Sequence, residues 1–312
     1  MMRGCSLKHI FYCLIVLVFI YVVFHPDRHA KIYSYISDDN ILSKIISNYV
    51  QTSTDNLQNC EYKQMLESAF EIFDINDLFK HDYNNIKAGG EYTPDCLPKF
   101  STAVIVCYRN RTQQLDAFIR YMHSYLPKQN IHYRIFIAEQ NDSAPFNRAL
   151  MLNYGSMIAM KYNFSCLILH DVDLLPLNSG NIYACTQQPR HMSCSIDIMR
   201  FNLPYYEIVG GVLAIQSEQY KLINGMSNQY YGWGGEDDDL YRRMIAKKLH
   251  PIRFSPWISK YTMLFHKHET PSPNRYTVLA DSLKRQESDG LNTLDRNYEV
   301  KLRPLFTHVI VN

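Results

Sequence analysis

The sequence predicts an α/β fold in which a parallel sheet is covered by helices. Three apolar runs have the length of buried strands, at 103–108, 133–138 and 166–170. Between them, apolar residues recur at helical spacing over 115–126 and again over 148–162. Strands and helices that alternate in this order are typical of βαβ units, whose strands run parallel to one another.

Charged side chains follow the first and third of these strands. Tyr108 is the last residue of the first strand, Arg109 and Arg111 follow it, and Asp171 to Asp173 follows the third strand. In open sheets of this kind, ligands bind at the carboxyl ends of the strands. The two carboxylates of Asp171 to Asp173 suit a divalent cation, and guanidinium groups match phosphate oxygens and stack on a planar base. These strand ends, together with the Phe146 to Arg148 segment, therefore predict a nucleotide diphosphate site.

The most distinctive stretch is Tyr231 to Asp239, in which an aromatic and glycine turn ends in four consecutive acids. A bare acidic run is usually a solvated face. Here the glycines beside Trp233 allow close approach to a ligand, and the indole is a plate on which a sugar ring can stack. The residues that follow have apolar side chains at helical spacing, so the acids are expected at a helix start, where negative charge is favoured.

A metal ligand is predicted near Met263 to His266, which follows a strand-like stretch. Taken alone, a histidine in this position is more often a core or surface histidine than a metal ligand. A histidine combined with a carboxylate from a distant segment favours Mn²⁺ over Mg²⁺, because Mg²⁺ prefers an all-oxygen shell.

The N-terminus contains an unbroken apolar run from Ile10 to Phe24, behind Arg3 and Lys8. The residues after the run, 25–28, offer no small-residue cleavage site. An uncleaved signal anchor is therefore favoured over a cleaved signal peptide, which is the alternative. The positive-inside rule then predicts a cytosolic tail at 1–9, an anchor at 10–24, a polar stem at 25–59 and a lumenal catalytic domain at 60–312.

Composition excludes some classes of protein. The 312 residues are 46% hydrophobic, enough for a substantial core, and the formal net charge of +2 gives no reason to expect a nucleic-acid partner. None of the eight cysteines forms a CxxC pair, which argues against a structural zinc site. Sequons at Asn141 and Asn163 are candidate glycan sites, whereas Asn110 lies within the predicted phosphate-binding segment and is a poorer one.

At these residues the chain resembles the β-1,4-galactosyltransferase family of Golgi type II glycosyltransferases. The resemblance implies a nucleotide-sugar-binding α/β fold of the GT-A-like kind, with a mixed central sheet flanked by helices. It covers roughly Cys60 to the C-terminus. The matching segments, in family order, are Tyr108 to Arg111, Phe146 to Ala149, Asp171 to Asp173, Gln188 to His191, Gly210 to Val212, Gly232 to Asp239, Met263 with His266, and Asp289 to Asn292.

The resemblance also implies roles for individual residues. Those that would bind the UDP-sugar donor are Tyr108, Arg109, Arg111, Phe146, Arg148, Val172, Asp173, Ile208, Trp233 and His266. Those that would bind the acceptor sugar are Gly235, Glu236, Asp237, Asp238 and Arg275. Asp173, Met263 and His266 would hold Mn²⁺, with methionine an unusual soft donor. Two disulfides are implied, Cys60 with Cys96 and Cys166 with Cys185, which leaves Cys107 and Cys194 as unpaired core thiols.

In the mechanism that the resemblance implies, Asp237 takes the proton from the 4-hydroxyl of a terminal β-N-acetylglucosamine, which attacks the donor anomeric carbon and inverts it. Three departures from the family pattern stand out: Cys107 and Tyr108 replace Pro and Phe, Ile198 replaces a usual Lys, and Ile208 replaces a common Tyr. A smaller apolar residue at position 208 leaves room for the N-acetyl group of a donor. The resemblance therefore favours UDP-GalNAc over UDP-Gal as the donor, and the alternative is that Ile208 is an ordinary β-branched strand residue.

Two other classes of function remain alternatives. A metal-dependent phosphohydrolase would use the same acids and histidine, but it gives no role to Trp233 or to the stem. An inactive sugar-binding homologue would have lost the base or the metal ligands, and Asp237, Asp173, Met263 and His266 are all present. The sequence does not specify whether the acceptor glycan is carried by protein or by lipid.

Overall fold

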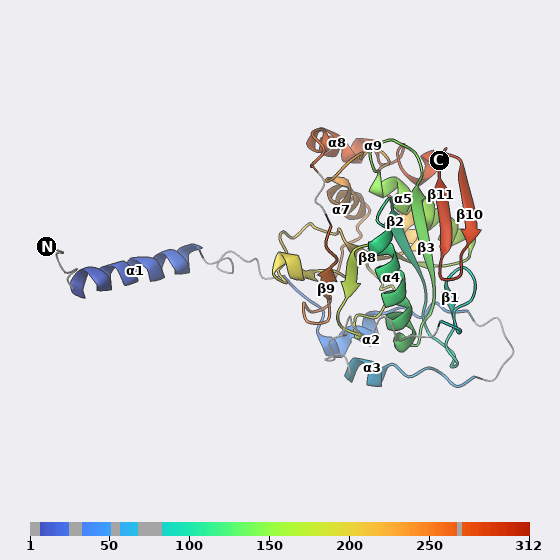
Figure 1. Cartoon of the computed structure of the whole chain (residues 1–312), viewed down its shortest axis with the longest axis horizontal. Helices are drawn as coiled ribbons and strands as arrows, with labels where there is room; N and C mark the ends of the chain where they lie inside the picture. Colours follow the sequence, from blue (N-terminus) through green and yellow to red (C-terminus); the bar gives the residue numbers. More distant parts are fainter. Residues whose placement is uncertain (1–6, 25–32, 51–56, 68–82, 267–269) are drawn as a thin grey trace. The chain divides into compact units, whose positions relative to one another are not determined.

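The computed structural model describes residues 7–24, 33–50, 57–67, 83–266 and 270–312 (Figure 1). The chain divides into two units, Met1–Ser34 and Tyr35–Asn312. In the first unit, the predicted apolar run lies in helix α1, Leu7–Phe24. Among the described residues, no helix combines the length and the apolar character that crossing a membrane requires. The signal anchor at 10–24 and the lumenal orientation therefore stay predictions.

The second unit is built on an eight-stranded sheet with the order β10-β11-β3-β2-β4-β8-β6, and β1 pairs with β3. The strands β11, β3, β2 and β4 are parallel neighbours, whereas β8 is antiparallel to β4 and β10 to β11. The sheet is thus mixed, with the predicted βαβ units at its centre. The strand bounds are β1 Glu91–Tyr92, β2 Ser101–Tyr108, β3 His132–Gln140, β4 Cys166–Asp171, β6 Arg190–His191, β8 Val212–Gln216, β10 Tyr298–Leu302 and β11 Thr307–Val311.

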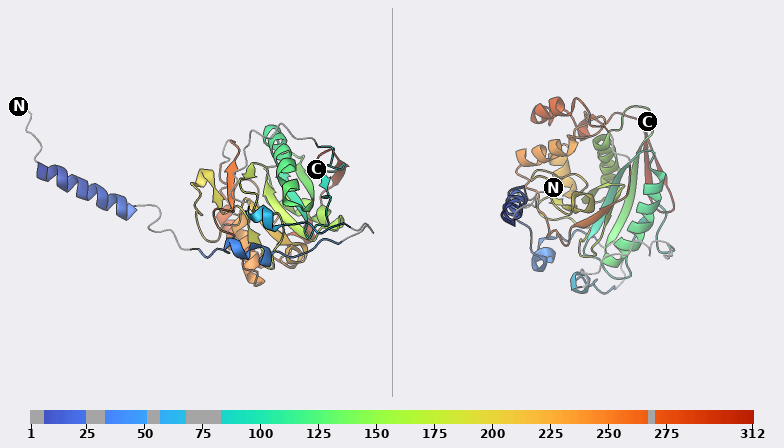
Figure 2. Two further views of the ribbon diagram at one scale, coloured as in Figure 1. Left: turned by 90° about the horizontal axis from the view of Figure 1, so that it is seen from below. Right: turned by 60° about the vertical axis from the view of Figure 1, so that its left-hand side comes forward.

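Helices cover both faces of this sheet, as Figure 2 shows from two further sides. Along β2, Val104 and Val106 face the core on the side of α4, Thr112–Tyr125, while Ile105 faces the core on the side of α5, Arg148–Lys161. This alternation is the two-residue period of a strand. Helix α5 packs closely because Gly155 has no side chain: a Cβ there would lie 2.4 Å from Ile105 Cγ2. The two overlapping βαβ units, β2-α4-β3 and β3-α5-β4, thereby hold the ends of β2 and β4 in fixed positions.

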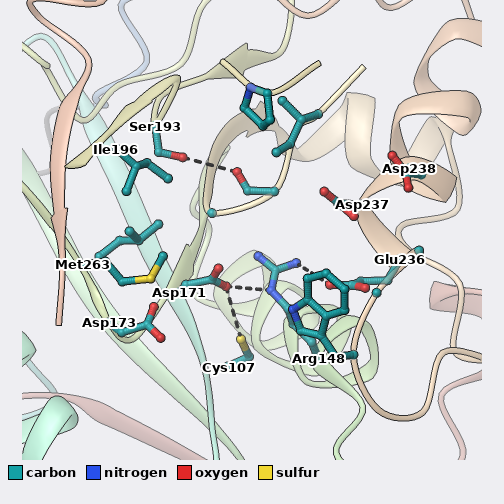
Figure 3. A pocket seen from close by; sticks show the side chains of 18 of the residues that line it. Cys107, Arg148, Asp171, Asp173, Ser193, Ile196, Glu236, Asp237, Asp238 and Met263 are labelled. Carbon is teal, nitrogen blue, oxygen red and sulfur yellow. Dashed lines mark hydrogen bonds and ion pairs between the residues drawn. The ribbon is translucent and has the colours of Figure 1, made fainter. Parts of the chain in front are cut away.

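A smaller three-stranded sheet, with the order β5-β9-β7, lies where the chain leaves β4. Its strands are β5 Leu174–Pro176, β7 Ser195–Ile196 and β9 Lys260–Met263. Leu174 pairs with Met263 across the antiparallel β5–β9 ladder. Because Asp173 immediately precedes β5, this pairing brings Met263 to the carboxyl end of β4. Figure 3 shows the side chains of Asp173 and Met263 beside each other.

Helix α7, Glu236–Ala246, carries the acidic run and begins after Gly235, whose φ of 95° lies in the left-handed region that glycine adopts freely. The fourth acid, Asp239, is fully buried and pairs with Arg243 at 2.5 Å between Oδ1 and Nε. Arg243 also donates from Nη1 to the carbonyl of Asp289 at 2.7 Å, and Tyr230 donates to Asp239 at 2.9 Å. This buried network fixes the start of α7, so Asp239 has a structural role.

The remaining helices are short. They are η2 Asp38–Asn40, α2 Ile41–Lys44, α3 Lys63–Glu67, η4 Leu126–Gln129, η5 Asp197–Met199, α6 Ser217–Leu222, α8 Arg275–Ala280, α9 Ser282–Arg285 and η6 Leu291–Thr293. Both disulfides implied by the resemblance are present, Cys60 with Cys96 and Cys166 with Cys185, and Cys107 and Cys194 are buried free thiols.

Part of the segment expected to be a stem belongs to the folded unit. Ile41 is fully buried in the core and Ile45 is nearly so. The Ile36 amide donates to the Arg253 carbonyl at 2.8 Å, and Ser255 donates to Asp38 at 2.7 Å. The folded unit thus begins at Tyr35, ahead of the boundary at residue 60 that composition predicts. A few well-placed isoleucines are enough to dock an otherwise polar segment.

Candidate functional site

A cavity of about 590 Å³ lies at the carboxyl ends of β2 and β4 and reaches the start of α7. Figure 3 shows Asp173 and Met263 on one side of it and Glu236, Asp237 and Asp238 on the other. The cavity therefore joins the predicted donor and metal residues to the acidic block. These segments are far apart in the sequence, and the sheet brings them together.

At one end of the cavity, Arg109 and Phe146 form a flat, cationic surface. The Arg109 guanidinium carbon lies 5.2 Å from the centre of the Phe146 ring, and Nη1 donates to the Ala144 carbonyl at 2.5 Å. This arrangement restrains the guanidinium beside the ring. An aromatic face next to a guanidinium suits a planar base attached to phosphate.

The base of the cavity contains an ion-paired group centred on Arg148, the first residue of α5. Its Nε lies 2.6 Å from Asp171 Oδ1, and its Nη1 lies 3.7 Å from Glu236 Oε1. Burial raises the pKa of Glu236, and the Arg148 cation limits that rise. The Cys107 thiol lies 3.9 Å from Asp171 Oδ1, and burial raises its pKa to about 12, which keeps it protonated. Arg148 thus links the end of β4 to the start of α7.

The two acids of the Asp171 to Asp173 motif have different partners. Asp171 pairs with Arg148, whereas Asp173 Oδ2 lies 2.7 Å from Arg111 Nη1 and 3.1 Å from His266 Nδ1. Burial raises the pKa of Asp173, and the nearby Asp171 charge adds to the rise. The sequence pattern suggested that both acids serve one cation, but the structure places only Asp173 beside the predicted histidine ligand.

The three predicted metal ligands supply one carboxylate, one imidazole and one thioether. Asp173 and His266 are in contact, and Met263 lies beside Asp173 through the β5–β9 pairing. The described residues contain no group of three or more His, Cys, Asp or Glu placed to hold a metal ion. A mixed nitrogen, oxygen and sulfur donor set suits Mn²⁺ better than Mg²⁺.

Asp237 lies in the cavity wall opposite Asp173 and Met263 (Figure 3). Gly210 packs against it so closely that a Cβ on Gly210 would be 2.7 Å from Asp237 Oδ2. Burial raises the pKa of Asp237 to about 7, and the neighbouring charges of Glu236 and Asp238 add to the rise. Asp238 accepts a hydrogen bond from Tyr205 at 3.0 Å. A carboxyl with a pKa near neutrality has the property that a general base requires.

The loop before α7 is held from both sides. The Gly232 amide donates to the Phe146 carbonyl at 2.8 Å, and the Ser272 amide donates to the Trp233 carbonyl at 2.9 Å. Trp233 itself is 57% exposed, so its indole face is available to a ligand. Gly234, with φ of 101°, lies against Arg275, where a Cβ would be 3.1 Å from Arg275 Cδ. Arg275 is thereby placed at the edge of the same cavity.

Most of the predicted site residues line this cavity. They are Arg109, Arg111, Phe146, Arg148, Val172, Asp173, Ile208, Trp233, Gly235, Glu236, Asp237, Asp238, Met263, His266 and Arg275. Tyr108 does not line it, because the alternation along β2 turns its side chain into the core, where its hydroxyl lies 3.4 Å from Thr112 Oγ1.

Sequence reasoning missed several residues that line the cavity, among them His191, Ser193, Tyr205 and Tyr276. His191 lies in one of the matching segments, Gln188 to His191, and this was the available signal. Tyr276 follows Arg275 directly. Ser193 and Tyr205 belong to no motif, and only the folded chain brings them to the cavity.

Two family models match the chain. One is described as the N-terminal region of glycosyl transferase group 7 and matches residues 58–186. The other is described as the N-terminal domain of galactosyltransferase and matches residues 190–267. Together they include the cavity residues from Cys107 to His266.

Two solved structures match the fold. One is the catalytic domain of Drosophila β-1,4-galactosyltransferase 7 with xylobiose, at 29% identity and a TM-score of 0.58, over 68% of this chain and 93% of that chain. The other is a mutant form of the Drosophila protein in complex with manganese, UDP-Gal and xylobiose, at 28% identity and a TM-score of 0.57. The mixed α/β fold and these matches define a glycosyltransferase with a GT-A-like fold.

Relatives of known activity identify the family more narrowly than the fold does. Bovine β-1,4-galactosyltransferase 1 is 37% identical over 272 residues, which is 84% of this chain and 68% of the relative. Human β-1,4-galactosyltransferase 1 is 38% identical over 234 residues, which is 73% of this chain and 59% of the relative. The chain belongs to the β-1,4-galactosyltransferase family, and it is accordingly a hexosyltransferase.

Proposed function

We propose that this chain is an inverting, Mn²⁺-dependent β-1,4-glycosyltransferase. It transfers Gal or GalNAc, with GalNAc favoured, from the UDP-sugar to the 4-hydroxyl of a terminal β-GlcNAc. The observation that supports this most strongly is the single cavity, which joins the Arg109 and Phe146 surface, the Asp173 and His266 pair, and Asp237. The residues proposed to bind the donor, to hold the metal and to act as the base could therefore contact one donor and one acceptor bound together.

In this proposal, Arg109, Arg111 and Phe146 bind the uridine diphosphate, because guanidinium groups match phosphate oxygens and the ring stacks on the base. Asp173, Met263 and His266 would hold Mn²⁺. When bound, the cation offsets the negative charge that develops on the departing diphosphate. Arg111 now lies 2.7 Å from Asp173, so this guanidinium is also close enough to share in neutralising that charge.

On the acceptor side, Asp237 accepts the proton of the attacking 4-hydroxyl. Glu236 and Asp238 accept hydrogen bonds from the other sugar hydroxyls, and Trp233 presents its exposed face to the ring. Arg275, next to Gly234, lies at the edge where the N-acetyl group of the acceptor would bind. The oxygen of the acceptor 4-hydroxyl forms the new glycosidic bond to the anomeric carbon as the bond from that carbon to UDP breaks. The proton remains on Asp237.

The donor preference depends on Ile208, which lines the cavity. A tyrosine at this position would extend further into the cavity and compete with an N-acetyl group for space. In a competition assay with both donors, Ile208→Tyr should shift transfer towards UDP-Gal, by about 10-fold or more for a few atoms of altered pocket volume. Ile208→Leu, which keeps the volume, is the matched control. An unchanged donor ratio in Ile208→Tyr would contradict the preference for GalNAc.

The reaction type is tested by measuring UDP release with and without a β-N-acetylglucosaminide acceptor. Release that requires both Mn²⁺ and acceptor supports transfer. Full release without acceptor would instead identify a phosphohydrolase, and no release under any condition would identify an inactive sugar-binding homologue.

The proposed location is the Golgi membrane, with the N-terminal segment as a type II anchor and the catalytic domain in the lumen. Support comes from the unbroken apolar run Ile10 to Phe24 behind Arg3 and Lys8. The full chain should stay with membranes during alkaline carbonate extraction, and its catalytic domain should be protected from added protease until the vesicles are opened. Release by carbonate would contradict the anchor.

A further inference from the structure

The segment Tyr206 to Gly210 carries Ile208 and leads into β8, yet it lies outside every strand of the two sheets. Its carbonyl groups at Tyr206, Ile208 and Gly210 accept hydrogen bonds from buried side chains of other segments. Two side chains that contact each other, Arg253 and His191, hold all three carbonyls.

Arg253 holds two of the three carbonyls. It is only 4% exposed, and its Nη2 donates to the Tyr206 carbonyl at 2.7 Å and to the Ile208 carbonyl at 2.9 Å. No carboxylate in the part of the chain that the structure describes forms an ion pair with it. Burial lowers the pKa of Arg253. The two carbonyl oxygens and the Tyr206 ring, whose centre lies 5.4 Å from the guanidinium carbon, face its charge.

His191 holds the third carbonyl and is in contact with Arg253. Arg253 Nε donates to His191 Nδ1 at 3.1 Å, so the hydrogen of the neutral ring is on Nε2, which donates to the Gly210 carbonyl at 3.0 Å. Burial, together with the Arg253 charge, lowers the pKa of His191 to about 3, so the ring stays neutral at the pH of the secretory pathway. Ser193 adds a second donor to the same carbonyl at 3.3 Å.

These contacts determine two features of the cavity. Ile208 forms part of the wall on the donor side, and Gly210 packs directly against the Asp237 carboxylate. A shift of the segment by about 1 Å would change both the room for a donor substituent and the position of the base.

We propose that Arg253 and His191 are positioning residues that set donor selectivity by fixing the carbonyls of 206, 208 and 210. We call this pair the wall clamp. The inference rests on the proposed transfer from a UDP-sugar and extends it, because it assigns selectivity to two buried residues, Arg253 outside the cavity lining and His191 within it, as well as to Ile208 itself.

The test uses Arg253→Met, which keeps the buried volume but removes every donor, and His191→Phe, which keeps a ring. For each variant, kcat and KM are measured with UDP-GalNAc and with UDP-Gal. The ratio of the two kcat/KM values should fall on the order of 10-fold, mainly through KM for the preferred donor. Arg242→Met is the control, because Arg242 also donates to a carbonyl, that of Leu279 at 2.8 Å, but lies outside the cavity.

A double-mutant cycle separates positioning from general destabilisation. If the wall clamp acts through Ile208, adding Arg253→Met to Ile208→Tyr should leave the donor ratio of Ile208→Tyr nearly unchanged. Fully additive effects would overturn the inference. Should Arg253→Met not fold, Arg253→Lys and His191→Phe provide the same comparison, since lysine reaches fewer carbonyls.

Wild-type activity tests the proposed function, and the donor ratios of the variants test the wall clamp. Wild type that uses neither donor overturns the proposed function, and the wall clamp with it. Active wild type with unchanged donor ratios in both Arg253→Met and His191→Phe overturns the wall clamp alone.

A second, independent observation concerns the three sequons. Asn163 is exposed, lies in the turn after α5 with φ of 63°, and its side chain forms no hydrogen bond with the described residues. Arg148, which lines the cavity, is at the other end of this 14-residue helix, roughly 20 Å away. By contrast, Asn141 donates to Asn312 at 2.7 Å, and Asn110 lies between two arginines that line the cavity.

We infer that Asn163 carries an N-linked glycan, on the assumption that the catalytic domain is lumenal as proposed. The full chain, made in animal cells, should lose the mass of one glycan on treatment with peptide N-glycosidase F. Asn163→Gln should remove this shift, whereas Asn110→Gln and Asn141→Gln should keep it. An unmodified Asn163 in protease-protected vesicles would overturn the glycan alone, and a catalytic domain outside the vesicles would overturn the lumenal location as well.

Discussion

Replacing Asp237 with asparagine is expected to remove the proton acceptor while keeping the shape of the cavity wall. Proton transfer to a positioned base contributes about 10²- to 10⁴-fold to rate, so kcat should fall by at least 100-fold. Donor affinity should change little, because the residues proposed to bind the donor diphosphate and base are Arg109, Arg111 and Phe146. Initial rates give kcat, and binding of UDP in the presence of Mn²⁺ gives the donor affinity.

The pH dependence gives this prediction a second measurement. Asp237 must be ionised to accept a proton, and its pKa is raised to about 7 by burial and by the charges of Glu236 and Asp238. The value of kcat/KM should therefore rise through pH 7 and level off above it, with about one tenth of the plateau at pH 6. Glu236→Gln removes one of the charges that raise this pKa, so it should move the midpoint to lower pH.

The free energy of unfolding of wild type should fall with rising pH, while its activity rises. The pKa of Asp237 in the folded chain lies above its ordinary value of 3.8, so the neutral carboxyl favours the folded state, and this contribution to stability is lost as the pH rises through about 7. Asparagine carries no charge. Asp237→Asn should therefore unfold at a higher temperature than wild type at pH 8, with the difference closing near pH 4. A variant that keeps wild-type turnover, or wild type with no change in rate between pH 6 and 8, would refute the assignment of Asp237 as the base.

Three further predictions concern the framework of the site. Asp239→Ala removes the nearer of the two carboxylates that pair with the buried Arg243, leaving Asp289 at 3.5 Å, and should lower the free energy of unfolding by about 3–5 kcal/mol, measured by denaturant titration. Chelation should abolish transfer, Mn²⁺ should restore it better than Mg²⁺, and Met263→Ala should raise the Mn²⁺ concentration for half-maximal rate; equal rescue of wild type by both ions would contradict the mixed donor set. Replacing both Cys166 and Cys185 with serine should cost about 2–5 kcal/mol, and an unchanged unfolding midpoint would show that this bridge is dispensable.

Much of the fold could be predicted from the sequence because its centre is strongly patterned. The strands β2, β3 and β4 are continuous apolar runs, and α4 and α5 show helical spacing, so their order alone indicates parallel βαβ units. The antiparallel strands β6 and β8 were not predicted, since β6 is two residues long and β8 follows an irregular segment. The packing of 35–49 on the domain was also not predicted, because it depends on isolated residues such as Ile41 in a polar stretch.

The site was predictable where chemistry is concentrated in short motifs. The acids of α7, the Asp171 to Asp173 motif and His266 are recognisable in the sequence, and the structure brings them to one cavity. Pairwise contacts were less predictable. The division of Asp171 and Asp173 between two arginines depends on which side chains reach each strand end, and the turn of Tyr108 into the core depends on the phase of β2. The support of Ile208 by Arg253 was not predictable, because Arg253 belongs to no motif.

The most direct test of the account is to incubate the protein with Mn²⁺, UDP-GalNAc or UDP-Gal, and a β-N-acetylglucosaminide, and to determine the product linkage by NMR. The account predicts a β-linked sugar on the 4-hydroxyl, formed only when donor, acceptor and metal are all present. An α-linked product, attachment to a different hydroxyl, or UDP release at the same rate without acceptor would contradict it.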